Sequence, residues 1–193
     1  MPKTIKNIYD NSVSFENLLK AHKKARYGKR EKKKIILFEL KLEQELLELE
    51  KQLKNGTYKH GGYTKFKIYE PKERIIMASE YKDRVVHQWY VVPQFINTSY
   101  AGIEGRGMHK ASKDVQKAMR SAKSKWKNYY ILKMDVTKYF ENIDKRILWE
   151  ILKRKMKDKK LLWLTREILL STEGIVGLPL GNYTSQMFAN IYL

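Results

Sequence analysis

Asp135 is the residue of this chain whose type and position best suit metal chemistry. It directly follows residues 130–134, where four of five positions are apolar, a pattern that favours a central strand covered on both sides. A carboxylate at the end of a buried strand is rigidly held and faces a cleft, where it can bind Mg²⁺ together with phosphate oxygens. The simpler alternative is a strand-end aspartate that caps a turn. Asp135 alone does not decide between them.

Few other chemistries compete with this one. The sequence has no cysteine, which excludes disulfides and cysteine-ligated metals. It has no phosphate-binding Gly-x-x-x-x-Gly-Lys loop and no Gly-x-Ser-x-Gly nucleophile motif. Its four histidines are scattered along the chain, and we assign them no role.

The elements before Asp135 change from helical to strand periodicity and back. Apolar spacing predicts helices over 14–27 and 35–53, the second stopped by Asn55 and Gly56. We then expect a hairpin over 63–69 and 74–78, followed by a helix from 79 to near Pro93. A glycine-rich loop over 97–107 should lead to a basic helix over 109–127, with its apolar face inward.

Helices dominate the part after Asp135. Asp144 is a good N-cap for a helix that runs to Met156, and another helix is expected over 159–170. Residues 174–181 read as strand and turn. Thr184 or Ser185 should begin a last helix that runs to 193 without a cap. We therefore expect a fragment of a longer chain, with Phe188 and Tyr192 facing structure outside it.

The charge of the chain points to a polyanionic partner. Its 193 residues (23.0 kDa) include 40 Lys and Arg against 21 Asp and Glu, a net charge of +19. The excess is spread along the chain, as expected for a folded basic surface that binds nucleic acid; the alternative is a merely solvated lysine-rich surface. Apolar runs are too short to span a bilayer and no signal peptide begins the chain, so we expect a cytoplasmic protein without membrane contact.

Four blocks of the sequence, taken together, resemble reverse transcriptases. Asp135-Val136-Thr137-Lys138-Tyr139-Phe140, continuing to Asp144, resembles the first catalytic motif of that family. Gly177-Leu178-Pro179-Leu180-Gly181, continuing to Gln186 and on to 189–193, resembles the next palm motif. Residues 71–74 with 81–88 resemble the fingers hairpin and its following helix, and 99–111 the motif between fingers and palm. The blocks stand in the family's order and cover roughly residues 60–193.

Within the family, the chain is most similar to the bacterial retroelement type: group II introns, retrons and diversity-generating retroelements. The Leu-Gly-x-x-x-Ser-Gln form at 180–186 looks most like the last of these. The resemblance implies an α+β fold with fingers and a partial palm, the palm being an incomplete antiparallel sheet. The implied domains are an N-terminal helical extension over 1–60, fingers over 61–128 and a partial palm over 129–193.

The resemblance also implies an activity and its partners. The family is an RNA-directed DNA polymerase, with an RNA template, a primer and deoxynucleoside triphosphates as partners; an accessory protein is left open. Asp135 would be the catalytic carboxylate and would hold two Mg²⁺ ions, helped by the backbone carbonyl of Val136.

Further residues would bind the nucleotide. Arg74, with Lys72 or Lys67, would reach the triphosphate, because cationic side chains suit phosphate oxygens. Phe140 would exclude a ribose 2′-hydroxyl, and Gly181 would allow close backbone approach. The alternatives are a solvated hairpin for the lysines and a core aromatic for Phe140.

Other residues would contact the nucleic acid itself. Gln186 would touch the template or the nascent pair, unless it is simply a solvent-facing helix residue. Arg84 and Arg106 would bind template backbone, or could equally be paired within the fold. Asp144 suits a helix cap better than a metal ligand.

One family element is missing from the chain. Reverse transcriptases carry a second acidic motif, Tyr-x-Asp-Asp, after the helix that ends here, and this sequence contains no Asp-Asp pair. We therefore expect the 193 residues alone not to polymerise. The alternative function is a non-catalytic RNA-binding module with the same fold. A Tyr-x-Asp-Asp motif encoded in frame after residue 193 would distinguish the enzyme from the binding module.

Overall fold

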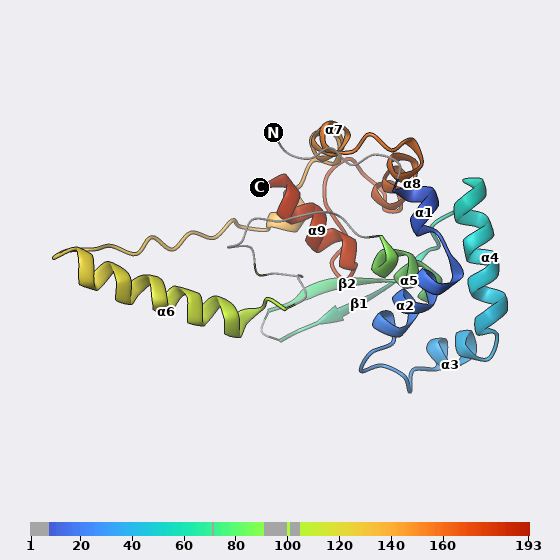
Figure 1. Cartoon of the computed structure of the whole chain (residues 1–193), viewed down its shortest axis with the longest axis horizontal. Helices are drawn as coiled ribbons and strands as arrows, with labels where there is room; N and C mark the ends of the chain where they lie inside the picture. Colours follow the sequence, from blue (N-terminus) through green and yellow to red (C-terminus); the bar gives the residue numbers. More distant parts are fainter. Residues whose placement is uncertain (1–7, 71, 91–99, 101–104) are drawn as a thin grey trace. The chain divides into compact units, whose positions relative to one another are not determined.

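The structure is a computed structural model that describes residues 8–70, 72–90, 100 and 105–193 (Figure 1). The chain forms two compact units, one made of residues up to 92 and from 140 onward, the other of residues 93–139. They are called unit 1 and unit 2 and described separately. Pro71, the helix end expected near Pro93 and most of the loop expected at 97–107 lie outside the described residues. The three-domain division inferred from the family resemblance stays a prediction.

Unit 1 begins with helices α1 (Tyr9–Ser12), α2 (Phe15–Ala25), α3 (Lys33–Glu39) and α4 (Leu42–Asn55). The helix predicted over 14–27 is confirmed as α2, and the Ser14 side chain caps it by accepting the Asn17 N–H at 3.3 Å. The stop predicted after α4 is also confirmed, because Gly56 is left-handed with φ of 68°.

The single helix predicted over 35–53 is wrong. The chain breaks at Leu40 and Lys41, between α3 and α4. The break lets the two halves use different neighbours: α3 packs on α5, whereas α4 packs on α2. The apolar spacing is helical on both sides of the break, so the sequence pattern alone does not show it.

The only sheet within the described residues is the predicted hairpin. Strands β1 (Tyr63–Ile68) and β2 (Arg74–Ser79) pair antiparallel, with Tyr63 opposite Ser79 and Ile68 opposite Arg74. With helices around this small sheet, the expected α+β class is confirmed in its coarse form.

Helix α5 (Tyr81–Trp89) links the N-terminal and C-terminal parts of unit 1. At its end, the Trp89 indole packs edge-on against Tyr9 at 5.5 Å between ring centroids and donates to the Ser12 carbonyl at 2.9 Å. The next residue, Tyr90, packs against Phe188, with ring centroids 6.0 Å apart. Two segments far apart in sequence therefore share one core through α5.

The C-terminal part of unit 1 holds α7 (Lys145–Lys155), α8 (Lys159–Leu169) and α9 (Tyr183–Tyr192), after the short 3₁₀ helix η1 (Tyr139–Asn142). The helices predicted over 144–156 and 159–170 are confirmed. Asp144 caps α7 by accepting the Arg146 N–H at 2.8 Å, and the bond from the Arg146 side chain lowers the Asp144 pKa to about 2.

The start and surroundings of α9 differ from expectation. Asn182, not Thr184 or Ser185, stands at its N-cap. Phe188 does not face structure outside the chain: it is 1% exposed, because Tyr90 covers its ring. The strand expected in 174–181 is reduced to one isolated bridge between Val176 and Asp144.

Unit 2 contains α6 (Met108–Lys125), which confirms the helix predicted over 109–127, and an extended segment after it (Figure 1). The buried central strand predicted over 130–134 is wrong. This segment pairs with no described strand, and Leu132 and Met134 are 80% and 81% exposed. An apolar run signals a need for burial, but it cannot supply the neighbouring strand that pairing requires.

The inward face predicted for α6 is also wrong. Val115 is 54% exposed and Trp126, just after the helix, is 61% exposed. No residue of α6 is buried. Helical spacing shows which side of a helix is apolar, but not whether another element covers that side. None of the helices in the described ranges is long and apolar enough to cross a membrane.

Asp158 joins the start of the chain to α8. Its carboxylate accepts the N–H groups of Lys160 and Leu161 at 3.1 and 3.2 Å as the α8 cap, and those of Ile8 and Tyr9 at 3.0 Å each. Burial raises the pKa of Asp158, but these four backbone donors outweigh it and hold the pKa below its usual value.

We expect Asp158→Ala to lower the free energy of unfolding by about 3 kcal/mol, since it removes a helix cap and leaves two further backbone donors unpaired. Asp144→Ala is the matched control, because the Asp144 side chain caps α7 but accepts from no backbone N–H outside that helix; it should cost less than half as much. Urea unfolding at neutral pH measures both. Equal losses would contradict the tethering role of Asp158.

Candidate functional site

The end of the first segment that resembles a palm motif, from Phe140 onward, lies beside the second such segment in unit 1. Three backbone N–H···O=C bonds of 2.8–2.9 Å join residues 140–145 to residues 175–178. Their donor–acceptor pairs are Leu178–Phe140, Gly177–Ile143 and Lys145–Ile175. The structure therefore brings residues 140–144, the end of the first sequence block, beside the start of the second block, while residues 135–139 belong to unit 2.

A buried lysine holds the same junction from inside. The Lys145 ammonium donates to the Thr172 carbonyl at 2.8 Å, the Thr172 hydroxyl at 2.9 Å and the Gly174 carbonyl at 3.0 Å. Burial lowers the pKa of Lys145. The three acceptors use all three ammonium donors, so this lysine fixes the loop after α8 rather than reaching a ligand.

The second palm-like segment also contacts the hairpin. The Met77 N–H of β2 donates to the Leu180 carbonyl at 2.7 Å. Gly181 has φ of +118°, and a Cβ at this position would lie 3.0 Å from both Ile76 Cγ2 and the Met77 carbonyl oxygen. Glycine is therefore required at this position because the backbone of residue 181 lies close to β2. The nucleotide contact expected of Gly181 stays a prediction.

The cations proposed for the triphosphate lie where the hairpin turns. Lys72 and Arg74 are exposed there. Lys67 instead forms an ion pair with Glu73 at 2.6 Å, with both side chains more than half exposed. Of the two lysines considered, Lys72 is therefore the one without an ion pair among the described residues.

Three other candidate residues of unit 1 are partly enclosed. Arg84 is half-buried and its Nε donates to the Ser79 carbonyl at 3.1 Å, so at least part of its guanidinium serves the fold. Gln186, near the start of α9, and Phe140, in η1, are both half-buried. For Gln186 this excludes a fully solvent-facing helix position.

The remaining candidates belong to unit 2. Asp135 and Val136 lie in the extended segment with exposed side chains, and Arg106 is half-buried just before α6. Because the two units are described separately, the structure does not place Asp135 beside Arg74, Phe140 or Gly181. Among the described residues, no group of three or more Asp, Glu and His side chains is arranged to hold a metal ion.

A buried polar network in unit 1 was not anticipated from the sequence. The Asp83 carboxylate, on α5, accepts the Tyr58 hydroxyl at 2.7 Å and the Gly61 N–H at 3.0 Å. His60 Nδ1 lies 2.7 Å from the Gly61 carbonyl, so it carries a hydrogen and leaves Nε2 as an acceptor in the neutral ring. His87 Nε2, 3.2 Å away, then donates to it. These two histidines, 27 residues apart, share no local motif.

The network continues from the hairpin to α9. Ser171 donates its hydroxyl hydrogen to the Ile168 carbonyl at 2.6 Å, so its oxygen accepts from the Tyr63 hydroxyl at 2.7 Å. The Tyr63 oxygen in turn accepts from the Asn182 side-chain amide at 2.7 Å. Tyr63, the first residue of β1, thereby fixes the residue that precedes α9.

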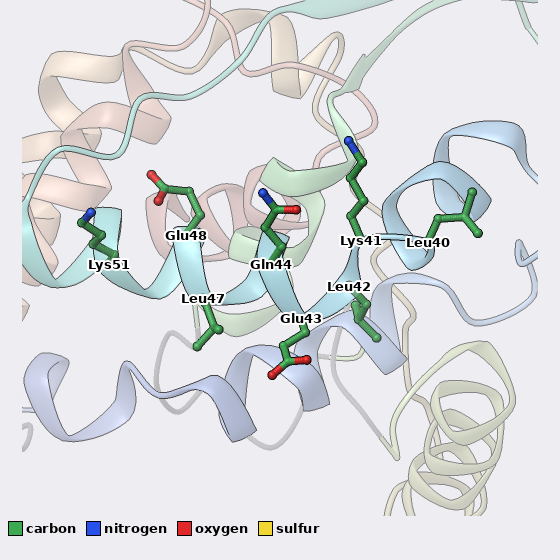
Figure 2. A pocket seen from close by; sticks show the side chains of 8 residues that line it. All are labelled: Leu40, Lys41, Leu42, Glu43, Gln44, Leu47, Glu48 and Lys51. Carbon is green, nitrogen blue, oxygen red and sulfur yellow. The ribbon is translucent and has the colours of Figure 1, made fainter.

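An open hollow lies elsewhere, along α4. Its lining side chains come from one short stretch of chain, as Figure 2 shows, and no predicted site residue is among them. They are Leu40, Lys41, Leu42, Glu43, Gln44, Leu47, Glu48 and Lys51. The break before α4 and the first turns of this helix provide side chains of mixed charge but no enclosed set of converging polar groups, so this hollow is not the candidate site.

The sequence matches no protein-family model and no curated protein. Two solved structures are similar in fold, each with a TM-score of 0.55 and 18% identity over 95% of this chain. Their titles are "Partial Cas6-RT-Cas1--Cas2 complex" and "Cas6-RT-Cas1--Cas2 complex", and the match covers 33% and 21% of those chains. The chain thus spans a third of one and a fifth of the other. At this identity the likeness shows a shared fold and no more.

The network generates a prediction on pH. Burial, with His60 and Arg84 nearby, lowers the pKa of His87 from 6.5 to about 3, so between these values the unfolded chain binds a proton that the folded chain does not. We expect the free energy of unfolding to fall as the pH drops below about 6.5, by up to ~1.4 kcal/mol per pH unit from His87.

His87→Gln should remove this contribution, whereas His109→Gln, on exposed α6, should not. Urea unfolding of the three proteins between pH 7 and pH 5 measures the slope. If His87→Gln keeps the slope of the parent, the buried neutral state of His87 is not the cause.

Gly181 provides the other prediction of this section. Gly181→Ala should lower the free energy of unfolding by roughly 2 kcal/mol, because alanine is strained at positive φ and its Cβ would meet β2. Gly62→Ala is the control: a Cβ there has no atom within 4 Å and its φ is not in the strained range. Thermal or urea unfolding compares them. Similar losses for both would refute the close approach of Gly181 to β2.

Proposed function

We propose that this chain is the fingers and first part of the palm of an RNA-directed DNA polymerase of the bacterial retroelement type. The observation that carries the proposal is the backbone ladder between residues 140–145 and 175–178, with its link from Leu180 to the hairpin. The end of the first family-like block, the start of the second and strand β2 of the hairpin, all far apart in sequence, meet there in unit 1. The likeness to solved chains whose titles include RT supports the same fold.

In this proposal the hairpin supplies the cations that receive the incoming triphosphate. Arg74 and Lys72 are exposed near the turn, as a solvent-borne ligand requires. The guanidinium of Arg74 offers two parallel N–H donors to phosphate oxygens. Tyr63, at the other end of β1, is held by Ser171 and Asn182, so the base of the hairpin is fixed while its tip stays open.

The Mg²⁺ ions implied by the family fit these residues only in part. Asp135 and the Val136 carbonyl are hard oxygen donors of the kind that Mg²⁺ prefers. Among the described residues no group of three or more Asp, Glu and His side chains could hold a metal ion, and the whole sequence has no Asp-Asp pair. We therefore propose that Asp135 contributes one ligand and that the others come from polypeptide outside these 193 residues.

The remaining assignments follow the same proposal. Phe140 would lie under the sugar of the nucleotide and exclude a 2′-hydroxyl, and Gln186 with Gly181 would lie along the template. Arg84 and Arg106 would contact nucleic-acid backbone through the guanidinium N–H groups that do not bond within the fold. RNA template, primer and deoxynucleoside triphosphates are the proposed partners, and the titles of the similar structures name protein partners of those chains.

The test is primer extension on an RNA template, with the longer protein that the proposal requires. Asp135→Asn should abolish nucleotide addition yet leave RNA affinity within about twofold, because it removes a metal ligand and no phosphate contact. Arg74→Ala is the contrasting variant: it should mainly raise the nucleotide KM, since it removes a triphosphate contact. Phe140→Ala should keep activity and admit ribonucleotides.

The outcomes separate the two functions. Extension by Asp135→Asn at a rate comparable to the parent would show that the palm assignment is wrong and that Asp135 only caps a turn. RNA binding without extension by the parent in any context would favour the non-catalytic RNA-binding module.

A further inference from the structure

Helix α6 concentrates positive charge on one face. Between Met108 and Lys125 it carries six cations and a single carboxylate, Asp114. Figure 1 shows it as one long uninterrupted helix. Four of the cations recur at the spacing i, i+3, i+7 and i+10, which places them in one row over about 15 Å of helix. They are Lys110, Lys113, Lys117 and Arg120, and all four are exposed.

Most of this row has no acidic partner. Asp114 accepts from Lys110 at 2.9 Å and from the Tyr100 hydroxyl at 2.8 Å; these bonds, that from Lys110 foremost, hold its pKa below the usual value. Lys113, Lys117 and Arg120 form no ion pair with any residue that the structure describes. We call these three the α6 stripe. Like charges three and four residues apart repel on a helix, so the α6 stripe opposes helix formation until an anion neutralises it.

Solubility alone does not require such a stripe, as α4 demonstrates. That helix also has an exposed outer side, but it carries charges of both signs, four glutamates and two lysines, with Glu50 paired to Lys54 at i,i+4. The contrast lies within one chain. A solvated helix can therefore be built here from mixed charge, whereas α6 is almost entirely cationic.

The apolar face of α6 lies opposite the stripe and shows which side faces outward. It is made of small or medium side chains: Ala111, Val115, Ala118, Met119 and Ala122. Whatever packs against α6 takes this face and leaves the stripe exposed. A face with three alanines lacks the large Trp, Phe and Leu side chains by which a basic helix inserts into a membrane surface.

We propose that the α6 stripe binds the phosphate backbone of RNA without reading its sequence. This inference rests on the proposed function in taking nucleic acid as the partner, but it adds a surface outside the residues assigned there. Lysine and arginine in a row along a straight helix can neutralise successive phosphates, and each contact releases counterions. The three cations of the stripe are exposed and form no ion pair within the described residues, so no partner there fixes them for reading a base edge.

The experiment uses the whole chain and a fluorescein-labelled RNA hairpin, with anisotropy measured between about 50 and 200 mM NaCl. The test variant carries Lys113→Gln, Lys117→Gln and Arg120→Gln. The matched control loses the same charge from exposed positions between α2 and α3: Lys29→Gln, Arg30→Gln and Lys32→Gln. We expect the test variant to bind at least tenfold more weakly at the lower salt. Its slope of log affinity against log salt should be smaller by about 2, at 0.7–0.9 per lost phosphate contact.

The RNA affinity of the control variant should stay within twofold of that of the parent. The double variant Lys113→Arg with Lys117→Arg keeps the charge and should keep the salt slope of the parent. This second control separates an effect of lost charge from misfolding. A second hairpin of unrelated sequence should bind equally well. Equal weakening of test and control variants, no change in the test variant, or a strong preference between hairpins would overturn the inference and leave the proposed function standing. Failure of the parent to bind either hairpin would count against both. Loss of binding to phosphatidylserine vesicles, with RNA binding intact, would assign the stripe to a membrane instead.

Discussion

The burial of the Asp83 carboxylate is the constraint on which the rest of unit 1 depends. This side chain is 0% exposed, and a buried charge without donors costs several kcal/mol. Its donors, the Tyr58 hydroxyl and the Gly61 N–H, both come from the segment between α4 and β1. Satisfying Asp83 therefore fixes that segment on α5. Gly61 has to be glycine for the same reason, since a Cβ there would lie 2.9 Å from the carboxylate.

From this point the restraints form a closed circuit. The fixed segment leads directly into Tyr63, whose hydroxyl joins Ser171 and Asn182. Asn182 follows Leu180 and Gly181, which lie on β2, and β2 pairs back with β1. Such a circuit of hydrogen bonds resists displacement, because no member can move far without breaking one of the bonds. The hairpin and the loop before α9 therefore move as one body, which suits residues that would have to hold a nucleotide between them.

The sequence predicts the local elements well and the tertiary ones poorly. Ser14 and Asp144 mark helix starts through their own side-chain oxygens, and Gly56 marks a helix end through its backbone freedom; such signals lie within a few residues. The pairing of His60 with His87 depends on how α5 packs against the segment before β1, so no local signal announces it. The break between α3 and α4 likewise comes from two different packing partners, whereas the apolar spacing runs on through it.

The wrong strand prediction and, under the proposed function, the need of Asp135 for further metal ligands have one physical origin. Residues 130–134 are apolar and extended but pair with no described strand, and Asp135 follows them with its carboxylate open to solvent. A sheet neighbour would cover the apolar side chains and satisfy the backbone N–H and C=O groups. Under the proposed function, the same neighbour would bring the further carboxylates that a Mg²⁺ site needs. The exposure of Leu132 and Met134 and the need of Asp135 for further ligands are then met together, because a single element would complete both strand pairing and metal binding.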